Sequence, residues 1–338
     1  MSTAELEVRG LTKHFRAGNA LFARSRVHAV DDVSFTLRPG TITALVGESG
    51  SGKSTIARLL VRLYDPTSGR IVFAGGDAAA ARRRRDVLRY RSQVQMIFQD
   101  PFGSLNPAKT VRHHVARPLR IHGVVPRDRV EARVHELLET VGLVPPEKIA
   151  AKYPHELSGG QRQRVAIARA LAVEPSVLVA DEPISMLDVS IRLGILNLML
   201  ELKQERRLAF LYVTHDLASA RYVADEVLVM YAGQIVEQGP TERVLGEPLH
   251  PYTRLLLESV PDPSRAERPE IEVRKGLASA AVDPPEGCRF VARCPLAIGV
   301  CSRVTPLLQE ARAGRRARCH VTAPSSATRE DRHVELAS

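Results

Sequence analysis

The sequence contains no tryptophan, and its aromatic residues make up only 4% of 338 positions. So few stacking side chains argue against a dedicated nucleic-acid-binding protein, even though the net charge is +10. Long apolar stretches are also missing, since runs such as residues 227–230 fall far short of the roughly 20 residues that a membrane-spanning helix needs. Glu5 and Glu7 stand where a signal peptide would have its apolar centre. These absences predict a cytosolic protein, or one that lies on a membrane without crossing it.

Cysteine is absent from the first 287 residues, and four cysteines then fall within 32 positions, at Cys288, Cys294, Cys301 and Cys319. In a cytosolic chain such a group indicates a metal or cluster site before it indicates disulfides. Nine of the 22 prolines lie between residues 240 and 295, which is typical of a linker or a loop-rich appendage. A C-terminal unit is therefore expected after the main domain.

The positive charge is spread along the chain and has one cluster, four arginines at residues 82–85. The simplest interpretation is a solvated loop that faces a membrane. Contact with lipid or with a membrane protein is the sharper alternative.

Segments with strand character alternate with segments with helical character along residues 6–214. The residue patterns predict β structure over 6–46, with a buried strand at 41–46, and further strands at 177–180 and 208–214. Helical spacing covers residues 56–63, 108–150 and 165–171. This alternation predicts an α/β fold with a parallel sheet covered on both faces.

A glycine-rich loop follows the buried strand. Residues 47–54 read Gly-Glu-Ser-Gly-Ser-Gly-Lys-Ser, which fits G-x-x-x-x-G-K-[ST] between a strand and a helix. The glycines allow backbone amides to wrap around phosphates, Lys53 would reach the β- and γ-phosphates, and Ser54 would bind Mg²⁺. The nucleotide-binding residues predicted here are Gly47, Glu48, Ser49, Gly50, Ser51, Gly52, Lys53, Ser54 and Thr55.

A buried strand that ends in two acids supplies the second half of such a site. Asp181 at its end would hold Mg²⁺, and Glu182 would accept a proton from an attacking water. Alone, this pattern is equally typical of a solvated acidic turn. The phosphate loop earlier in the chain favours the catalytic interpretation.

A third motif gives the chain a family likeness. The pentapeptide Leu157, Ser158, Gly159, Gly160 and Gln161 opens a helix, whose N-terminus suits an anion. With the two earlier motifs, in this order, the chain resembles the ABC-transporter ATPase family. The resemblance implies a P-loop ABC ATPase domain made of a parallel core sheet, an antiparallel β subdomain and a helical subdomain. It also implies that the pentapeptide closes on ATP held by a second ATPase subunit.

The resemblance assigns roles to three further residues. Phe15 would stack on adenine, with a plain core position as the alternative. Gln99 would sense the metal and the attacking water, and His215 would hold the γ-phosphate. The catalytic pair would be Glu182 and His215, and the magnesium ligands would be Ser54, Gln99 and Asp181.

Residues 99–107, residues 250–256 and the cysteine window are similar to the oligopeptide, dipeptide and nickel importer ATPases. This likeness implies that the four cysteines bind a [4Fe–4S] cluster, which takes four thiolates. Zinc is the competing metal, although its usual C-x₂₋₄-C pairs are missing, and metal-free thiols are the third alternative. Two positions depart from the family pattern, where Ile184 and Met186 replace threonine and alanine. Met186 would lie near the partner ATPase and alter cooperativity between the two sites.

The expected organisation is an ABC ATPase domain at 1–245, with a helical subdomain at about 100–164, an extension at 246–321 and a disordered tail at 322–338. The resemblance implies an ATP-hydrolysing importer subunit on the cytoplasmic face of the membrane. Its partners would be two permeases, an identical or related second ATPase subunit and, indirectly, an extracytoplasmic solute-binding protein. Peptides, nickel and sugar oligomers are all compatible as cargo. The alternative is a soluble ABC ATPase acting on nucleic acid or ribosomes, whereas the importer interpretation expects no nucleic acid.

Overall fold

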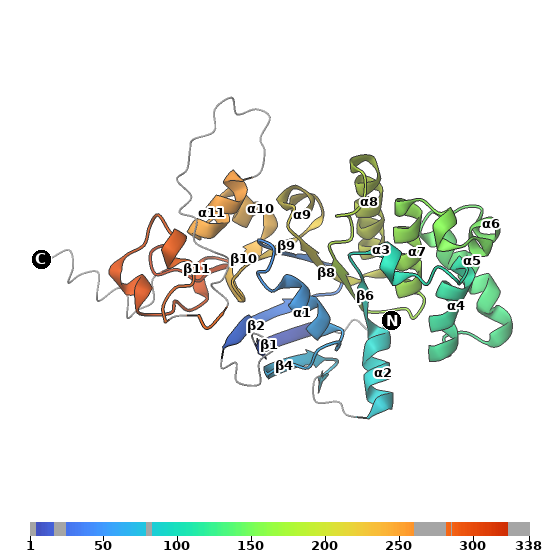
Figure 1. Ribbon diagram of the computed structural model, residues 1–338, viewed down its shortest axis with the longest axis horizontal. Coiled ribbons are helices and arrows are strands. Elements are labelled where there is room, and N and C mark those ends of the chain that lie inside the picture. Colours follow the sequence, from blue (N-terminus) through green and yellow to red (C-terminus); the bar gives the residue numbers. More distant parts are fainter. Residues whose placement is uncertain (1–4, 17–24, 79–82, 260–281, 285, 324–338) are drawn as a thin grey trace, which may run out of the picture.

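The computed structural model describes residues 5–16, 25–78, 83–259, 282–284 and 286–323. Within these residues the strands form two sheets, with α1 (Lys53–Leu60) and α2 (Arg84–Gln93) near the smaller sheet and the other helices above and to the right of the strands in Figure 1. None of the helices in the described part is both long and apolar enough to cross a membrane.

The larger sheet has the strand order β11-β12-β10-β9-β3-β8-β7-β6. Its strands are β3 (Ile42–Val46), β6 (Val94–Ile97), β7 (Val177–Asp181), β8 (Ala209–Thr214), β9 (Glu226–Tyr231), β10 (Gln234–Pro240), β11 (Gln309–Arg312) and β12 (Arg315–Ala317). The five strands from β9 to β6 are parallel, and β10, β12 and β11 continue the sheet antiparallel. The predicted parallel core is confirmed.

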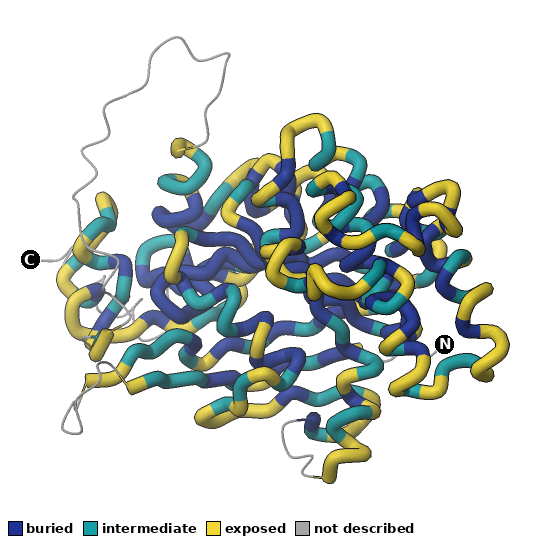
Figure 2. The backbone as a smooth tube through the Cα atoms, turned by 45° about the vertical axis from the view of Figure 1, so that its right-hand side comes forward, coloured by how far each residue is buried: buried dark blue, intermediate teal, exposed yellow. Residues whose placement is uncertain are grey.

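The smaller sheet is antiparallel, in the order β2-β1-β4-β5. Its strands are β1 (Leu6–Arg16), β2 (Arg26–Leu37), β4 (Ser68–Phe73) and β5 (Gly76–Asp77). Alternate side chains of the larger sheet face two different cores, so that Leu211 packs with the smaller sheet while Phe210 packs with the helical layer. The larger sheet is therefore buried on both faces, as the dark central strands of Figure 2 show.

Helices surround the larger sheet. They are α1 (Lys53–Leu60), α2 (Arg84–Gln93), α3 (Pro101–Ser104), α4 (Val111–His122), α5 (Val130–Thr140), α6 (Pro146–Ala151), α7 (Gly159–Leu171), α8 (Val189–Arg206), α9 (Leu217–Val223), α10 (Thr241–Gly246) and α11 (Pro251–Glu258). Helices α4, α5 and α6 pack on one another beside α7, at the right of Figure 1. Short 3-10 turns lie at Arg127–Arg129, Pro154–Glu156, Val291–Arg293 and Gly299–Ser302.

The segment expected as a C-terminal extension, residues 246–321, is more than a loop-rich appendage in its described part. Its hairpin of β11 and β12 pairs with β10 and enlarges the core sheet. A buried ion pair of 3.2 Å between Arg315 and Glu237 lies at this junction. The composition alone could not predict this, because the partners are 78 positions apart. The tail beyond residue 323 lies outside the described residues.

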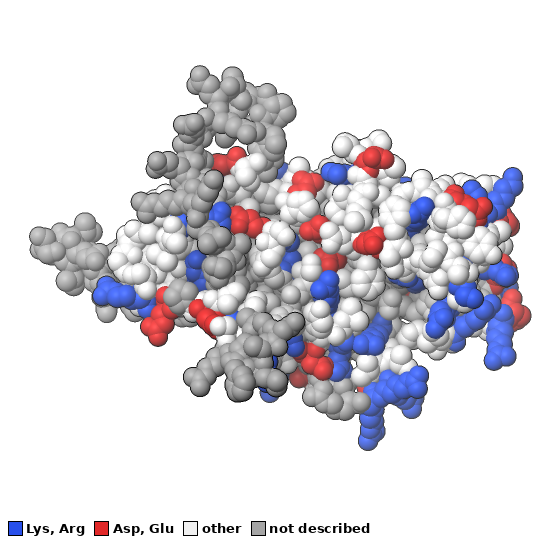
Figure 3. Space-filling view, in the orientation of Figure 1, with Lys and Arg blue, Asp and Glu red and all other residues white. Residues whose placement is uncertain are grey.

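Arginine and lysine side chains gather in Figure 3 around α2 and the end of the molecule that carries α4 to α6. Of the arginine cluster, Arg83, Arg84 and Arg85 are exposed, and α2 begins at Arg84. Arg82 lies outside the described residues.

Candidate nucleotide site

The phosphate loop joins β3 to α1, as the motif predicts. Gly47 and Gly52 have φ values of 152° and 109°. A Cβ at Gly47 would lie 2.2 Å from the Met230 carbonyl oxygen, and one at Gly52 would lie 2.0 Å from that of Ala29. These two positions exclude any side chain, because the loop is pressed against backbone on both sides.

Lys53 is only 5% exposed, and its ammonium group points into the loop. Its Nζ donates to the carbonyl oxygens of Gly47 and Glu48 at 2.7 and 2.8 Å. Burial lowers the pKa of Lys53, although the carboxylates of Glu182 and Asp181 oppose the shift. A buried cation whose hydrogen bonds go to neutral carbonyls is suited to an incoming anion.

Ser54 and Asp181 meet at the end of β7. The Ser54 hydroxyl donates to Oδ1 of Asp181 at 3.0 Å. Burial raises the pKa of Asp181, and the Ser54 hydrogen bond partly offsets this effect. The pair offers only oxygen donors beside the phosphate loop, which is the donor set that Mg²⁺ prefers, so these residues fit the expected metal.

Glu182 follows Asp181 and is held from two sides. Oε2 accepts from the Gln99 amide at 3.0 Å, and Oε1 lies 3.1 Å from Nδ1 of His215. Its φ of 46° is in the left-handed region, which is costly for a residue with a side chain. The structure thus brings together the three residues that the sequence placed around the attacking water.

These groups line one cavity of about 480 Å³. The predicted residues that line it are Ser49, Gly50, Gly52, Lys53, Ser54, Thr55, Gln99, Glu182 and His215. Phe15 is not among the lining residues; it packs edge-on against Tyr64, with ring centroids 5.5 Å apart. Its partner across the strands, Val27, does line the cavity, so Phe15 lies one strand away from it.

The pentapeptide forms the start of α7, where Ser158 and Gln161 make reciprocal capping hydrogen bonds. Gly160 touches α8 so closely that a Cβ would lie 2.5 Å from a methyl carbon of Ile191. None of the five residues lines the phosphate cavity of its own chain. Met186 is 55% exposed, whereas Ile184 is buried.

The four cysteines are free thiols. Burial, together with a smaller effect of the other three thiols, raises the pKa of Cys288 to about 11. Among the described residues no three thiol sulfurs lie within 4.8 Å of one another. Zinc would bring its thiolates to about 4 Å, since Zn–S bonds are about 2.3 Å long. Among the described residues the thiols are therefore not arranged as zinc ligands, and the iron–sulfur prediction is not confirmed.

Contacts between the extension and the phosphate loop were missed from the sequence. Both Nη atoms of Arg293 pair with the Glu48 carboxylate at 2.9 Å, and the Tyr252 hydroxyl accepts from the Glu48 amide, also at 2.9 Å. The Glu48 hydrogen bonds raise the pKa of Arg293. The only sequence signal was that Arg289 and Arg293 stand beside two of the cysteines.

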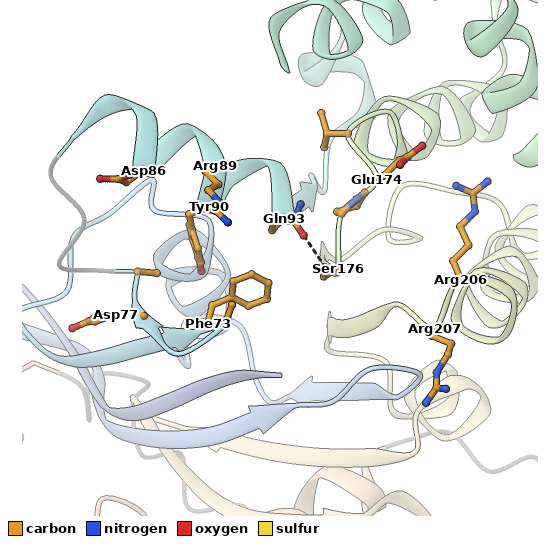
Figure 4. A pocket seen from close by; sticks show the side chains of 15 residues that line it. Phe73, Asp77, Asp86, Arg89, Tyr90, Gln93, Glu174, Ser176, Arg206 and Arg207 are labelled. Atoms are coloured by element: carbon orange, nitrogen blue, oxygen red, sulfur yellow. Dashed lines mark hydrogen bonds between the residues drawn. The ribbon is translucent and has the colours of Figure 1, made fainter. Parts of the chain in front are cut away.

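A second cavity, of about 670 Å³, lies between α2 and the segment before β7 (Figure 4). Its wall combines acidic, basic and aromatic side chains, and Gln93 and Ser176 are hydrogen-bonded across it at 2.8 Å. It contains none of the motif residues, so the cavity at the phosphate loop is the better candidate for nucleotide.

The phosphate loop between β3 and α1, with the acidic end of β7 beside it, defines the class of P-loop nucleoside triphosphatases. Residues 30–185 match the ABC transporter family, and residues 236–301 match the oligopeptide/dipeptide transporter C-terminal region.

Relatives extend this match to most of the chain. The probable peptide ABC transporter ATP-binding protein y4tS of Sinorhizobium fredii is 45% identical, covering 97% of this chain and 92% of that protein. The oligopeptide transport ATP-binding protein AppF of Bacillus subtilis is 43% identical, and the match covers 94% of this chain and 97% of that protein. The ATP-binding cassette MJ0796 was solved as a dimer in a post-hydrolysis state with ADP and phosphate. It has a TM-score of 0.61 at 28% identity, and the match covers 70% of this chain and 98% of that chain. The chain therefore belongs to the ATP-binding proteins of the ABC transporter family, as its ordered motifs predict.

Proposed function

We propose that this chain is the ATP-binding and ATP-hydrolysing subunit of an ABC importer for peptides or similar small solutes. The observation that supports ATP hydrolysis is that Gln99 and His215 both contact the Glu182 carboxylate at hydrogen-bond distance. The names of the relatives and the match of the C-terminal region support peptides or similar small solutes as the transported cargo. They disfavour the alternative of a soluble ATPase acting on nucleic acid or ribosomes.

The site residues divide the work of hydrolysis. Lys53 and the loop amides bind the phosphates. His215 holds the γ-phosphate and orients the water, and Gln99 senses the metal and that water. As the water oxygen bonds to the γ-phosphorus, Glu182 takes a proton from that water. The bond from the γ-phosphorus to the bridging oxygen breaks, and ADP and phosphate leave. Ser54, Gln99 and Asp181 would hold Mg²⁺, which neutralises phosphate charge when bound.

The pentapeptide at the start of α7 is the basis for proposing a second ATPase subunit as a partner. Because it lines no phosphate cavity in its own chain, we propose that it completes the site of a second, identical or related ATPase subunit. Residues 100–156 would form the helical subdomain that docks on the membrane permease, at the cytoplasmic membrane face. The assembly would contain two permeases, and a solute-binding protein outside would supply the cargo. We divide the chain into an ATPase domain at 1–245, with a helical subdomain at about 100–164, and an extension at 246–321.

A [4Fe–4S] cluster on the four cysteines stays a prediction. Support comes from the number of thiols, which equals the number that such a cluster takes. Anaerobic purification followed by iron and sulfide analysis would test it.

Replacing Glu182 by glutamine tests the proposed chemistry. The amide keeps the shape but cannot take up the proton, so turnover should fall by about 10² to 10⁴-fold while ATP affinity stays unchanged. Nucleotide titration and phosphate release would measure the two effects, with Glu201→Gln on the exposed face of α8 as control. Near-normal turnover of Glu182→Gln would overturn its assignment as the base.

A further inference from the structure

Glu48 is the second residue of the phosphate loop, yet it is held by the C-terminal extension. Its two carboxylate oxygens face the two terminal nitrogens of Arg293, 245 positions later, in a bidentate pair. Its backbone amide donates to the hydroxyl of Tyr252 in α11. The carbonyl of the same residue accepts from Lys53, so a shift of Glu48 would move the ammonium group that binds phosphate.

The Arg293 side chain is only 12% exposed and is held by an aromatic cluster. Its guanidinium lies 5.7 Å from the ring centre of Tyr231 and 5.8 Å from that of Phe290. The fully buried Tyr252 packs on both rings, with centroid distances of 4.6 and 5.5 Å. A bidentate pair with a pre-oriented arginine loses little side-chain freedom when it forms, and so it fixes the position of its partner.

The extension also holds the opposite side of the loop. Arg289 donates to the carbonyl of Ala232 and to the carboxylate of Asp31. Gly233, the residue after Ala232, donates its amide to the carbonyl of Ser51 in the phosphate loop at 2.9 Å. Arg293 therefore contacts the loop directly, whereas Arg289, four residues earlier, is connected to it through Ala232 and Gly233.

From these contacts we propose that Arg293 and Tyr252 are positioning residues for ATP binding, and that the extension sets the affinity of the phosphate loop for nucleotide. The proposal rests on the proposed function, since it assumes that this loop binds ATP. A loop already ordered in the free protein loses less entropy when phosphate binds. Freed from Arg293, the Glu48 carboxylate would also bring negative charge close to the phosphates.

The test compares full-length variants by nucleotide titration and steady-state hydrolysis. Arg293→Gln should raise the ATP dissociation constant and KM about tenfold and leave kcat nearly unchanged, because Glu182, Gln99 and His215 lie on other elements. Tyr252→Phe removes only a hydroxyl and should weaken binding several-fold, and Arg293→Lys should recover part of the affinity. Arg303→Gln, at an exposed position of the extension, is the matched control.

A comparison of single and double variants tests whether Arg293 positions Glu48 for ATP binding or only attaches the extension to the rest of the chain. Glu48→Gln and Arg293→Gln should not add in their effects on ATP affinity, because each breaks the same pair. Unchanged ATP affinity in Arg293→Gln and Tyr252→Phe, even with a lowered melting temperature, would overturn the proposal and leave the proposed function intact. A wild-type chain that binds no ATP would overturn both.

Discussion

Glu182 combines two features that belong to the scale of a single residue. Its backbone adopts a left-handed conformation, which costs about 1–3 kcal/mol. Its amide donates to the carbonyl of Val213 at 2.9 Å, and its carboxylate is held by Gln99 and His215. These contacts offset the strain and aim the carboxylate into the cavity, which is the geometry that a proton acceptor for an attacking water requires.

Phe15 tests whether the adenine lies against the end of β1. Phe15→Ala should raise the ATP dissociation constant about tenfold, since stacking of a base on an aromatic ring contributes about 1–3 kcal/mol. Phe15→Tyr retains a ring and should bind ATP normally. Fluorescence titration would measure affinity and a melting curve would measure stability. Lowered stability with unchanged affinity in Phe15→Ala would instead make Phe15 a packing residue against Tyr64.

At the scale of an element, the N-cap of α11 is a buried neutral histidine. Nδ1 of His250 accepts from the Tyr252 amide, and burial lowers the pKa of His250 to about 3. The unfolded chain takes up this proton near pH 6.5, so the stability that neutral His250 contributes is complete above pH 6.5 and is lost as the pH falls towards 3.

His250→Asn keeps an acceptor at the helix N-cap and removes this titration. The wild-type chain should lose about 2 kcal/mol more unfolding free energy than the variant between pH 7 and pH 5. Denaturant titrations at both pH values would measure the difference. Parallel pH dependence in the two proteins would show that His250 does not titrate in this way.

Strands with a recognisable local sequence pattern could be predicted from the sequence, whereas contacts between distant segments could not. The strand expected at 41–46 is β3 (Ile42–Val46), and the one at 177–180 is β7 (Val177–Asp181), because both are apolar runs next to recognisable loops. The hairpin of β11 and β12 is short and polar, and one of its strands contains the buried Arg315, which pairs with Glu237. Nothing near Arg293 in the sequence identifies Glu48 as its partner.

At the scale of the whole molecule, the Glu237–Arg315 pair should determine how firmly the extension is attached. Glu237 is fully buried and also accepts from the amides of Leu249 and His250. Glu237→Gln leaves the buried guanidinium with only the exposed carboxylate of Glu247, 3.9 Å away, as counter-charge. The free energy of unfolding should therefore fall by about 3 kcal/mol in chemical denaturation.

Glu242→Gln is the matched control, because it breaks an exposed pair with Arg221 and should cost less than about 1 kcal/mol. Equal losses in Glu237→Gln and Glu242→Gln would contradict the proposed importance of the buried pair.

The central claim is that this chain drives a membrane importer. The most direct measurement is recovery of the full-length Glu182→Gln chain from native membranes in mild detergent with MgATP, followed by mass spectrometry of what accompanies it. The bound but slowly hydrolysed nucleotide should hold the assembly closed, so two multi-span permeases and a second ATPase subunit should be recovered. Ribosomal proteins or nucleic acid in place of membrane proteins would contradict the account.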